Sequence, residues 1–176
     1  MRLNLREIIE IPGGSVPFSQ ELDTALLDFP SVRAYTAPIT AEGKVVNTAG
    51  ILTLQGKLHA EMLCVCDRCG AEFPRTVDLD LHADITADAQ DDDPEVFTLD
   101  GDWLDVDEVL STCFILSMDT KCLCRPDCAG LCDRCGANLN LGPCRCQKPR
   151  DPRMAVLEQL LDNKTDEEEE AAHNSD

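Results

Sequence analysis

Cysteine is the residue that most limits what this chain can fold into. The chain carries eleven cysteines, and five of them fall within residues 128–146, "CAGLCDRCGANLNLGPCRC". Disulfide frameworks, redox pairs and metal sites all use cysteine at such density, but they are typical of different compartments. Because the count is odd, disulfides within one chain cannot account for all of these thiols.

The N-terminal sequence helps to choose among these classes. In "MRLNLREIIEIPGGS" charged residues interrupt every short apolar run, so the apolar core of a signal peptide is absent. No stretch approaches the roughly 18 consecutive apolar residues of a membrane-spanning helix. We therefore expect a soluble, cytoplasmic protein without a membrane partner, in which reduced thiols serve metal binding or catalysis.

The spacing of the late cysteines predicts a metal site. Cys132 and Cys135 form a C-x2-C pair followed by Gly136, and Cys144 and Cys146 form a C-x-C pair eight residues later. Four thiolates suit a structural Zn²⁺ ion in a closed tetrahedral site. We therefore predict that these four cysteines bind Zn²⁺ and that the ion has no open position for a reacting water.

A second C-x2-C pair, Cys66 and Cys69, lies between predicted strands. Two thiolates are too few for zinc, and Cys124 and Cys128 are the spare pair with suitable spacing, so a second site is conceivable. Two alternatives remain: packed cysteines in a hairpin, or a thiol redox pair. Thioredoxin-like chemistry needs C-x2-C at the start of a helix, whereas a strand is predicted here. Three further cysteines belong to neither set: Cys64, Cys113 and Cys122.

Apolar periodicity predicts the rest of the fold. Residues 34–86 read mainly as strands, and in residues 77–85 apolar residues alternate with Asp78, Asp80, His82 and Asp84. This alternation predicts a half-buried antiparallel strand with an acidic outer face. A helix is predicted over 105–116, capped by Asp105, and another over 152–161.

Together these patterns predict an α+β fold. A mainly antiparallel β domain with one helix covers residues 1–120, a Cys-rich zinc-binding module with a short C-terminal helix covers 121–162, and a disordered acidic tail covers 163–176. The sequence has no P-loop, no G-x-S-x-G and no G-x-G-x-x-G, and its three histidines are scattered. We therefore expect no catalytic residues, no enzymatic activity and no small-molecule substrate.

Charge is unevenly distributed along the chain, whose net charge is −19. Residues 76–120 contain fourteen acidic residues and no Lys or Arg, whereas residues 121–153 contain seven basic and three acidic residues. A solvated surface would explain both runs. The acidic face could instead bind a basic protein through Asp78, Asp80 and Asp84. The basic patch could contact RNA, through Arg125, Arg134, Arg145, Lys148 and Arg150.

The order of several motifs resembles one known family. "CDRCGAEF", an acidic strand-rich stretch, "LDVDEVL", "CRPDCAGLCDRCGANLNLGPCRC" and "DPRMAVLEQL" follow one another across about residues 60–161. This arrangement resembles the YceD family, the large ribosomal RNA subunit accumulation proteins. By position, Cys66, Arg68 and Cys69 match its first block, Asp105 and Glu108 its helix, and residues 124–146 its Cys-rich block. The chain departs from the pattern at "ILSMDTKCLC", where a proline is usual after the helix.

The resemblance implies a specific function, which the residue patterns alone do not indicate. It implies a non-enzymatic ribosome biogenesis factor that supports 23S rRNA accumulation and large-subunit assembly. Its expected partner is a basic large-subunit ribosomal protein, with bL32 a candidate because the genes are commonly adjacent, or a 23S rRNA precursor. The alternative is a cytosolic thiol redox protein that uses Cys66 and Cys69.

Overall fold

The computed structural model describes residues 1–86 and 96–146. The chain divides into two compact units, Met1–Gly130 and Leu131–Asp176. The boundary thus follows Gly130 rather than residue 120, because the segment after the long helix returns to the first unit through Cys122, Cys124 and Cys128. The helix predicted over 152–161 and the acidic tail over 163–176 lie outside the described residues.

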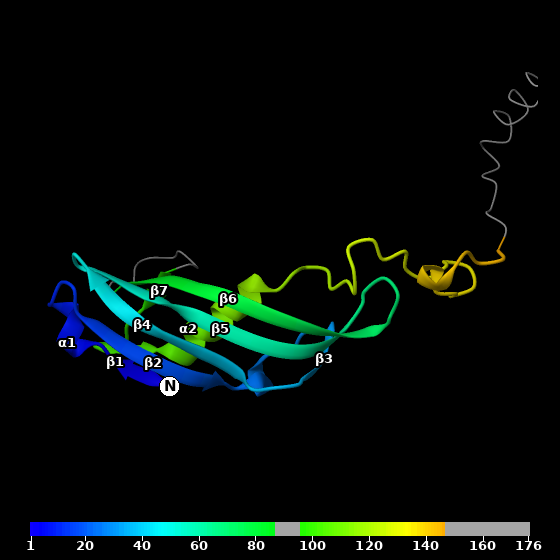
Figure 1. Ribbon diagram of the computed structural model, residues 1–176. Helices are drawn as coiled ribbons and strands as arrows, with labels where there is room; N and C mark the ends of the chain where they lie inside the picture. Colours follow the sequence, from blue (N-terminus) through cyan, green and yellow to red (C-terminus); the bar gives the residue numbers. More distant parts are fainter. Residues whose placement is uncertain (87–95, 147–176) are drawn as a thin grey trace, which may run out of the picture. The chain divides into compact units, whose positions relative to one another are not determined.

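The first unit is built on one long, twisted sheet of six strands (Figure 1). Its strand order is β2-β4-β5-β6-β7, and β3 pairs with the far end of β5. All pairings are antiparallel except that of β6 with β7. The strands are β2 (Ser15–Leu22), β3 (Val32–Tyr35), β4 (Ile39–Thr48), β5 (Ile51–Val65), β6 (Glu72–Thr86) and β7 (Val96–Thr98).

Smaller elements complete the described part of the chain. A two-stranded sheet pairs β1 (Arg2–Asn4) with β8 (Trp103–Asp105). The helical segments are α1 (Arg6–Ile9), η1 (Thr24–Leu26), α2 (Val106–Ser117) and η2 (Leu139–Leu141). The predicted α+β class is confirmed. Among the described helices, none is long and apolar enough to cross a membrane.

The alternation in β6 determines which face of the sheet is buried. Leu81, Ala83 and Ile85 are buried, whereas His82 and Asp84 between them are exposed. The odd-numbered residues of β6 therefore face the core and the even-numbered residues face solvent, as predicted.

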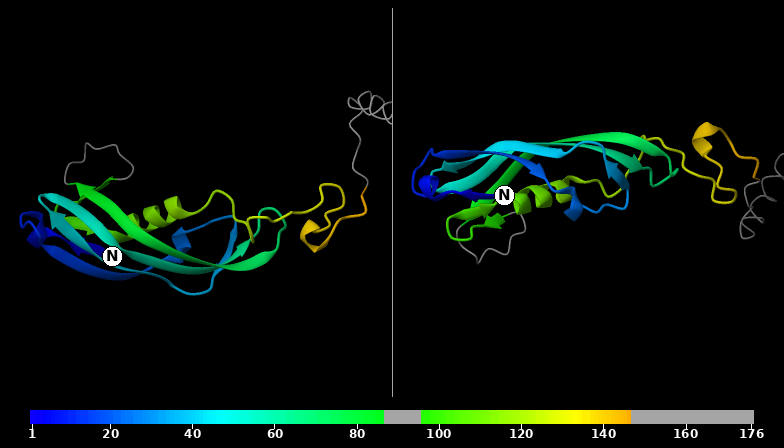
Figure 2. Two further views of the ribbon diagram at one scale, coloured as in Figure 1. Left: turned by 45° about the horizontal axis from the view of Figure 1, so that its top comes forward. Right: turned by 90° about the horizontal axis from the view of Figure 1, so that it is seen from below.

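Paired glycines sit at the middle of the sheet. Gly43 of β4 lies directly opposite Gly56 of β5, between Phe18 on one side and Leu81 on the other. A Cβ added at Gly43 would lie 2.2 Å from the Gln55 carbonyl oxygen, so a larger residue would push the two strands apart. The pair allows a close backbone approach within a sheet that curves strongly (Figure 2).

α2 covers the buried face of this sheet (Figure 2). The Asp105 carboxylate accepts a hydrogen bond from the Asp107 backbone N–H (3.1 Å), which confirms the predicted N-cap. Phe114 is fully buried and packs edge-on against Phe29, with ring centroids 5.8 Å apart. Cys113 is only half-buried, so Phe114 is the residue that completes the apolar face. The helix ends at Ser117 without a proline.

Candidate metal centres

The first cysteine cluster starts from the turn between β5 and β6. Gly70 N–H donates to the Cys66 carbonyl (2.8 Å), and Cys66 N–H donates to the Ala71 carbonyl (2.9 Å). Gly70 adopts a φ of 68°, which favours glycine. This tight turn brings Cys66 and Cys69 onto one side of the hairpin, where both sulfurs can face one ion.

Hydrogen bonds bring the other two cysteines of the cluster to the same turn. The Asp67 backbone N–H donates to the Cys122 carbonyl (2.8 Å), and the Asp67 carboxylate accepts from the Cys122 N–H (2.6 Å). Arg68 Nη1 donates to the Cys128 carbonyl (2.9 Å). These bonds join the hairpin to the segment that carries Cys124 and Cys128, although more than fifty residues separate them in sequence.

The four sulfurs of this cluster have the spacing of a metal site. The Sγ atoms of Cys66 and Cys128 are 3.8 Å apart, and those of Cys69 and Cys124 are 3.7 Å apart. All four lie within 4.8 Å of one another, and three of the four cysteines are buried. A tetrahedron of sulfurs about 2.3 Å from a zinc ion has edges of about 3.8 Å, whereas a disulfide needs about 2.05 Å. The arrangement could therefore hold a metal ion.

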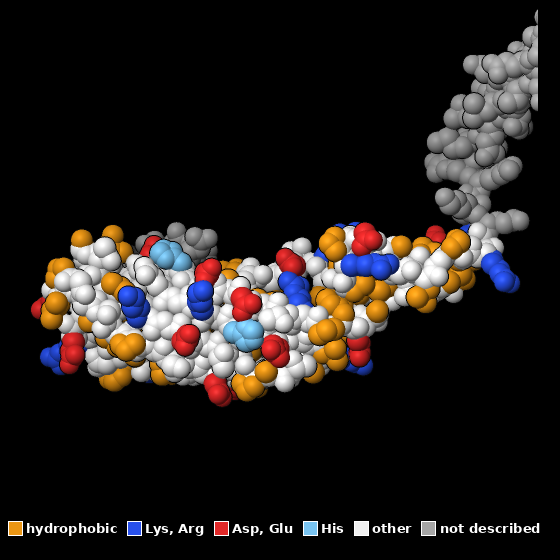
Figure 3. Space-filling model, viewed as in Figure 1, with side chains coloured by type: hydrophobic (Ala, Val, Ile, Leu, Met, Phe, Trp, Pro, Cys, Tyr) orange, Lys and Arg blue, Asp and Glu red, His pale blue; other side chains and the backbone are white. Residues whose placement is uncertain are grey.

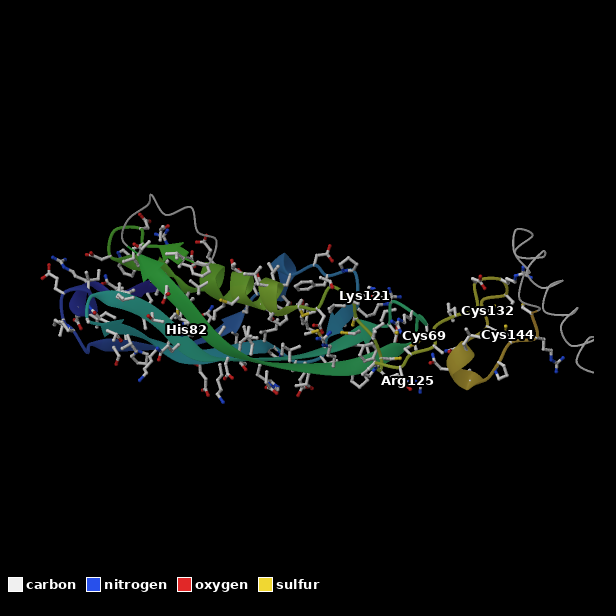
Figure 4. All side chains as sticks on the ribbon, turned by 90° about the horizontal axis from the view of Figure 1, so that it is seen from above. Cys69, His82, Lys121, Arg125, Cys132 and Cys144 are labelled. Atoms are coloured by element: carbon white, nitrogen blue, oxygen red, sulfur yellow. The ribbon has the colours of Figure 1, made fainter. Side chains whose placement is uncertain are left out.

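The second cluster repeats this turn in the second unit. Gly136 N–H donates to the Cys132 carbonyl (2.9 Å), Cys132 N–H donates to the Ala137 carbonyl (2.8 Å), and Gly136 has a φ of 70°. The sulfurs of Cys132 and Cys144, side by side in Figure 4, are 3.4 Å apart. All four sulfurs of Cys132, Cys135, Cys144 and Cys146 lie within 4.8 Å of one another.

The two turns share one hexapeptide. Residues 66–71 and residues 132–137 both read "CDRCGA". The repeat is visible in the sequence when the two C-x2-C segments are aligned, but the C-x2-C spacing alone did not point to it. The structure thus brings together both predicted sets of cysteines, while metal binding itself and the identity of the metal remain predictions.

Backbone groups of the turns stabilise one thiolate in each cluster. Burial of Cys66 opposes its charge, but the backbone N–H groups of Cys124, Cys69 and Arg68 lower the pKa of its thiol to about 6. The corresponding backbone N–H groups of the second turn lower the pKa of Cys132 to about 7. One sulfur in each cluster is therefore ready to bind a cation near neutral pH.

Crowding of the sulfurs opposes further loss of protons. Burial, followed by hydrogen bonds from neighbouring sulfurs, raises the pKa of Cys124 to about 12. The neighbouring Cys135 sulfur, and then burial, raise the pKa of Cys146 to about 12. Four thiolates cannot form this close together without a compensating charge, and a divalent cation supplies one.

The remaining cysteines lie in or near the main core. Cys64 and Cys122 are buried, and burial together with a hydrogen bond to Cys122 raises the pKa of Cys64 to about 11. Arg75 Nη1 lies 3.9 Å from the Cys122 sulfur, and its Nη2 donates to the Asp119 carboxylate (2.6 Å). These contacts anchor the segment that leaves α2.

The acidic residues of β6 lie on the outer face, as predicted, but they are not alone there. Lys57 Nζ lies 3.9 Å from Asp80, and His59 Nδ1 lies 2.6 Å from Asp78, both across the β5–β6 pair. A hydrogen bond with Asp78 is the main cause that raises the pKa of His59. Figure 3 accordingly shows acidic, basic and histidine side chains interspersed on this face. The face is less purely acidic than β6 alone suggested.

The predicted RNA-binding residues are distributed over both units. Arg125 of the first unit lies 3.5 Å from the Asp127 carboxylate. Arg134 and Arg145 belong to the second unit. Lys148 and Arg150 lie outside the described residues. RNA binding by this set remains a prediction.

Comparisons with known proteins point to one family. A family model described as "Large ribosomal RNA subunit accumulation protein YceD" matches residues 54–161. Uncharacterized proteins of Mycobacterium bovis and Mycobacterium tuberculosis are 28% identical over 122 residues, which cover 66% of this chain and 58% of theirs. A chloroplastic protein of Zea mays named large ribosomal RNA subunit accumulation protein YCED homolog 1 is 24% identical over 147 residues, which cover 65% of this chain and 50% of the maize protein.

The matched relatives are longer than the match, since the chain spans between half and three-fifths of their length. No solved structure matches the chain significantly. The family match covers more than half of the chain, including β6, α2 and all eight clustered cysteines. This chain therefore belongs to the YceD family of large ribosomal RNA subunit accumulation proteins.

Proposed function

We propose that this protein is a non-enzymatic, cytoplasmic assembly factor for the large ribosomal subunit. It supports accumulation of 23S rRNA by binding a basic large-subunit ribosomal protein before that protein meets RNA. The family match carries this proposal. The exposed carboxylates of Asp78, Asp80 and Asp84 support a cationic protein partner, because a chain of net charge −19 repels RNA over most of its surface.

In this proposal, both cysteine clusters hold Zn²⁺ as a structural ion. Thiolate-only ligand sets favour zinc among the common divalent ions, and the 3.7–3.8 Å sulfur separations of the first cluster suit its tetrahedral geometry. The ion would fix the two turns and their neighbouring segments. Metal analysis of protein purified under reducing conditions tests this, with two zinc ions per chain expected.

Direct RNA contact is the second candidate. Arg134 lies between Cys132 and Cys135, and Arg145 lies between Cys144 and Cys146, so an ion bound by the second cluster would hold both arginines on a compact scaffold. Opposite-charge variants separate the two candidates. Asp80→Lys with Asp84→Lys should weaken binding to a basic protein, more at low salt than at high salt. Arg134→Glu with Arg145→Glu should abolish RNA retention and leave protein partners intact.

Co-sedimentation with ribosomal particles tests the function itself. Tagged protein is expected to migrate with precursors of the large subunit and not with mature ribosomes. A protein that never migrates with precursors, with both zinc ions in place, would contradict the proposal.

A thiol redox role is disfavoured by the geometry of the first cluster. Cys66 and Cys69 lie in a turn between two strands rather than at the start of a helix. Each also has a sulfur of the other pair within 4 Å. Zinc content together with the absence of a titratable free Cys66–Cys69 pair would exclude this alternative.

A further inference from the structure

β6 is an open sheet edge along most of its length. β5 pairs with residues 72–85 of β6 on one side. On the other side β7 pairs only with residues 84–86, so no strand of the described chain covers residues 72–83. In Figure 1, β6 borders the sheet and β7 lies beside only one of its ends. A row of backbone donors and acceptors is therefore available at this border.

Residues of even number direct their backbone groups toward the open edge. Successive residues of an antiparallel strand point their N–H and C=O groups alternately toward and away from the partner. The Thr86 carbonyl accepts a hydrogen bond from Leu99 N–H (3.1 Å) on the β7 side. Pro74 is also an even-numbered residue of β6, and proline, which lacks an N–H, is tolerated in a strand where the backbone faces an open edge. The exposed backbone groups are those of Thr76, Asp78, Asp80 and His82.

A groove of about 450 Å³ runs beside this edge, between β6, the start of β7 and the last turns of α2. Leu79, Leu81 and Phe97 line it from the sheet side, and Leu116 lines it from α2. Leu116 is 68% exposed, which is unusual for a leucine in a helix that covers a core. A strand added to β6 would place every second side chain in this apolar groove.

The other side chains of an added strand would lie beside the acidic residues of β6. On the outer face, Asp78 and Asp80 would be cross-strand neighbours of the added strand. Opposite charges stabilise such cross-strand pairs, so basic side chains are favoured there. Lys57 and His59 approach these carboxylates only from the β5 side. Addition of a second copy of β6 would instead bring like charges together. The edge thus selects a strand that alternates basic and apolar residues.

We propose that residues 76–82 of β6 bind an extended segment of a basic protein, in which Lys or Arg alternates with apolar residues, by strand addition. This inference rests on the proposed function, because it gives the binding mode of the basic ribosomal protein. β2, at the opposite border of the sheet, is a poorer edge, since Pro17 near its middle has no N–H to offer.

A synthetic peptide tests the binding mode directly. The probe is a capped peptide of about seven residues that alternates lysine with valine, and its control has the same composition with lysines and valines in separate blocks. Only the alternating peptide should bind, and it should protect the amides of Thr76, Asp78, Asp80 and His82 from hydrogen exchange. Methylation of every second peptide N–H in the register that faces β6 should abolish binding. Equal binding of the block peptide, or unchanged exchange at these amides, would overturn the inference.

One pair of variants separates the contribution of the edge backbone from that of the His82 side chain. His82→Pro removes an edge N–H, whereas His82→Ala removes the same side chain and keeps the N–H. The proline variant should bind the alternating peptide about fivefold to tenfold more weakly than the alanine variant, as expected for one lost backbone hydrogen bond. Equal affinities of the two folded variants would contradict strand addition. If the proline variant does not fold, binding of the methylated peptide to the unmodified protein tests strand addition instead.

The same variants distinguish failure of the inference from failure of the proposed function. If the unmodified protein does not co-sediment with large-subunit precursors, the function fails, and the peptide still decides the inference. If it co-sediments and His82→Pro does so equally, the function stands and strand addition is overturned. A dimer that His82→Pro abolishes would assign the edge to a second copy of the chain and also overturn the inference.

Discussion

The two cysteine clusters share a hexapeptide and a turn but differ in what surrounds them. In the first cluster Cys66, Cys69 and Cys128 are buried, and Phe73 and Leu123 pack against them. In the second cluster Cys135 is exposed, and Cys132 is the only buried residue among the described residues 131–146, so no apolar core supports this cluster there.

Secondary structure supports the two clusters just as unequally. The first lies at the end of two strands of fifteen residues each. In the described part of the second unit, regular structure is limited to one bridge, between Leu131 and Asn138, and the short η2 segment. The same six residues can therefore form the same turn, but only the first turn rests on an independently stable fold.

Removal of the metal should produce the largest contrast between the clusters. Chelation under reducing conditions should unfold residues 131–146 and leave the sheet of the first unit folded, because structural zinc supplies roughly 10 kcal/mol to modules of this size. Amide hydrogen exchange of the full chain measures both regions at once. Retention of protection in residues 131–146 after complete metal loss would contradict the comparison.

Loss of one ligand in the first cluster should have an intermediate effect. Cys69→Ser should release the metal and lower the free energy of unfolding of the first unit by about 3 kcal/mol, while the sheet persists. Cys113→Ser, a half-buried cysteine outside both clusters, is the matched control and should cost about 1 kcal/mol. Urea denaturation monitored by circular dichroism compares the two, and equal losses would argue against a metal at the first cluster.

Equivalent aspartates of the two hexapeptides should differ more modestly. The Asp67 carboxylate accepts a hydrogen bond from the Cys122 N–H and so orients the segment that carries Cys124. The Asp133 carboxylate instead contacts the sulfur of its neighbour Cys132 (3.8 Å). Asp67→Ala should lower the zinc affinity of the first cluster about tenfold. Asp133→Ala should change the second by less than about threefold. Competition with a chromophoric chelator measures both affinities.

Titration of the metal-free protein should give the smallest difference. The pKa of Cys66 is about 6 and that of Cys132 about 7, both below the usual 9.0 of a thiol. Both thiolates are therefore present at high pH. Because metal loss unfolds the second turn, the pKa of Cys132 should rise from about 7 toward 9.0, whereas Cys66 keeps its folded turn. As pH falls, Cys132 should therefore protonate first and Cys66 last, through pH 6. Thiolate absorbance of Cys66→Ser and Cys132→Ser variants assigns each step, and the reverse order would contradict the stronger backbone stabilisation of Cys66.

Local patterns in the sequence determined the elements and the turns. Alternation in residues 77–85 predicted the buried and exposed faces of β6, and Asp105 predicted the start of α2, because both signals come from residues close together in the chain. The C-x2-C pair of Cys132 and Cys135, followed by Gly136, likewise pointed to a site at one turn, since the glycine and the two thiols lie close together in the chain.

Only the tertiary structure decided which distant residues meet. Asp67 and Arg68 bring Cys124 and Cys128 to Cys66 and Cys69, so these residues belong to the first unit and not to a separate C-terminal module. Strand pairing also placed Lys57 and His59 beside the β6 carboxylates and left the outer edge of β6 open. Periodicity tells which side chains share a face, but strand order and register depend on contacts between residues far apart in sequence, and no local pattern encodes them.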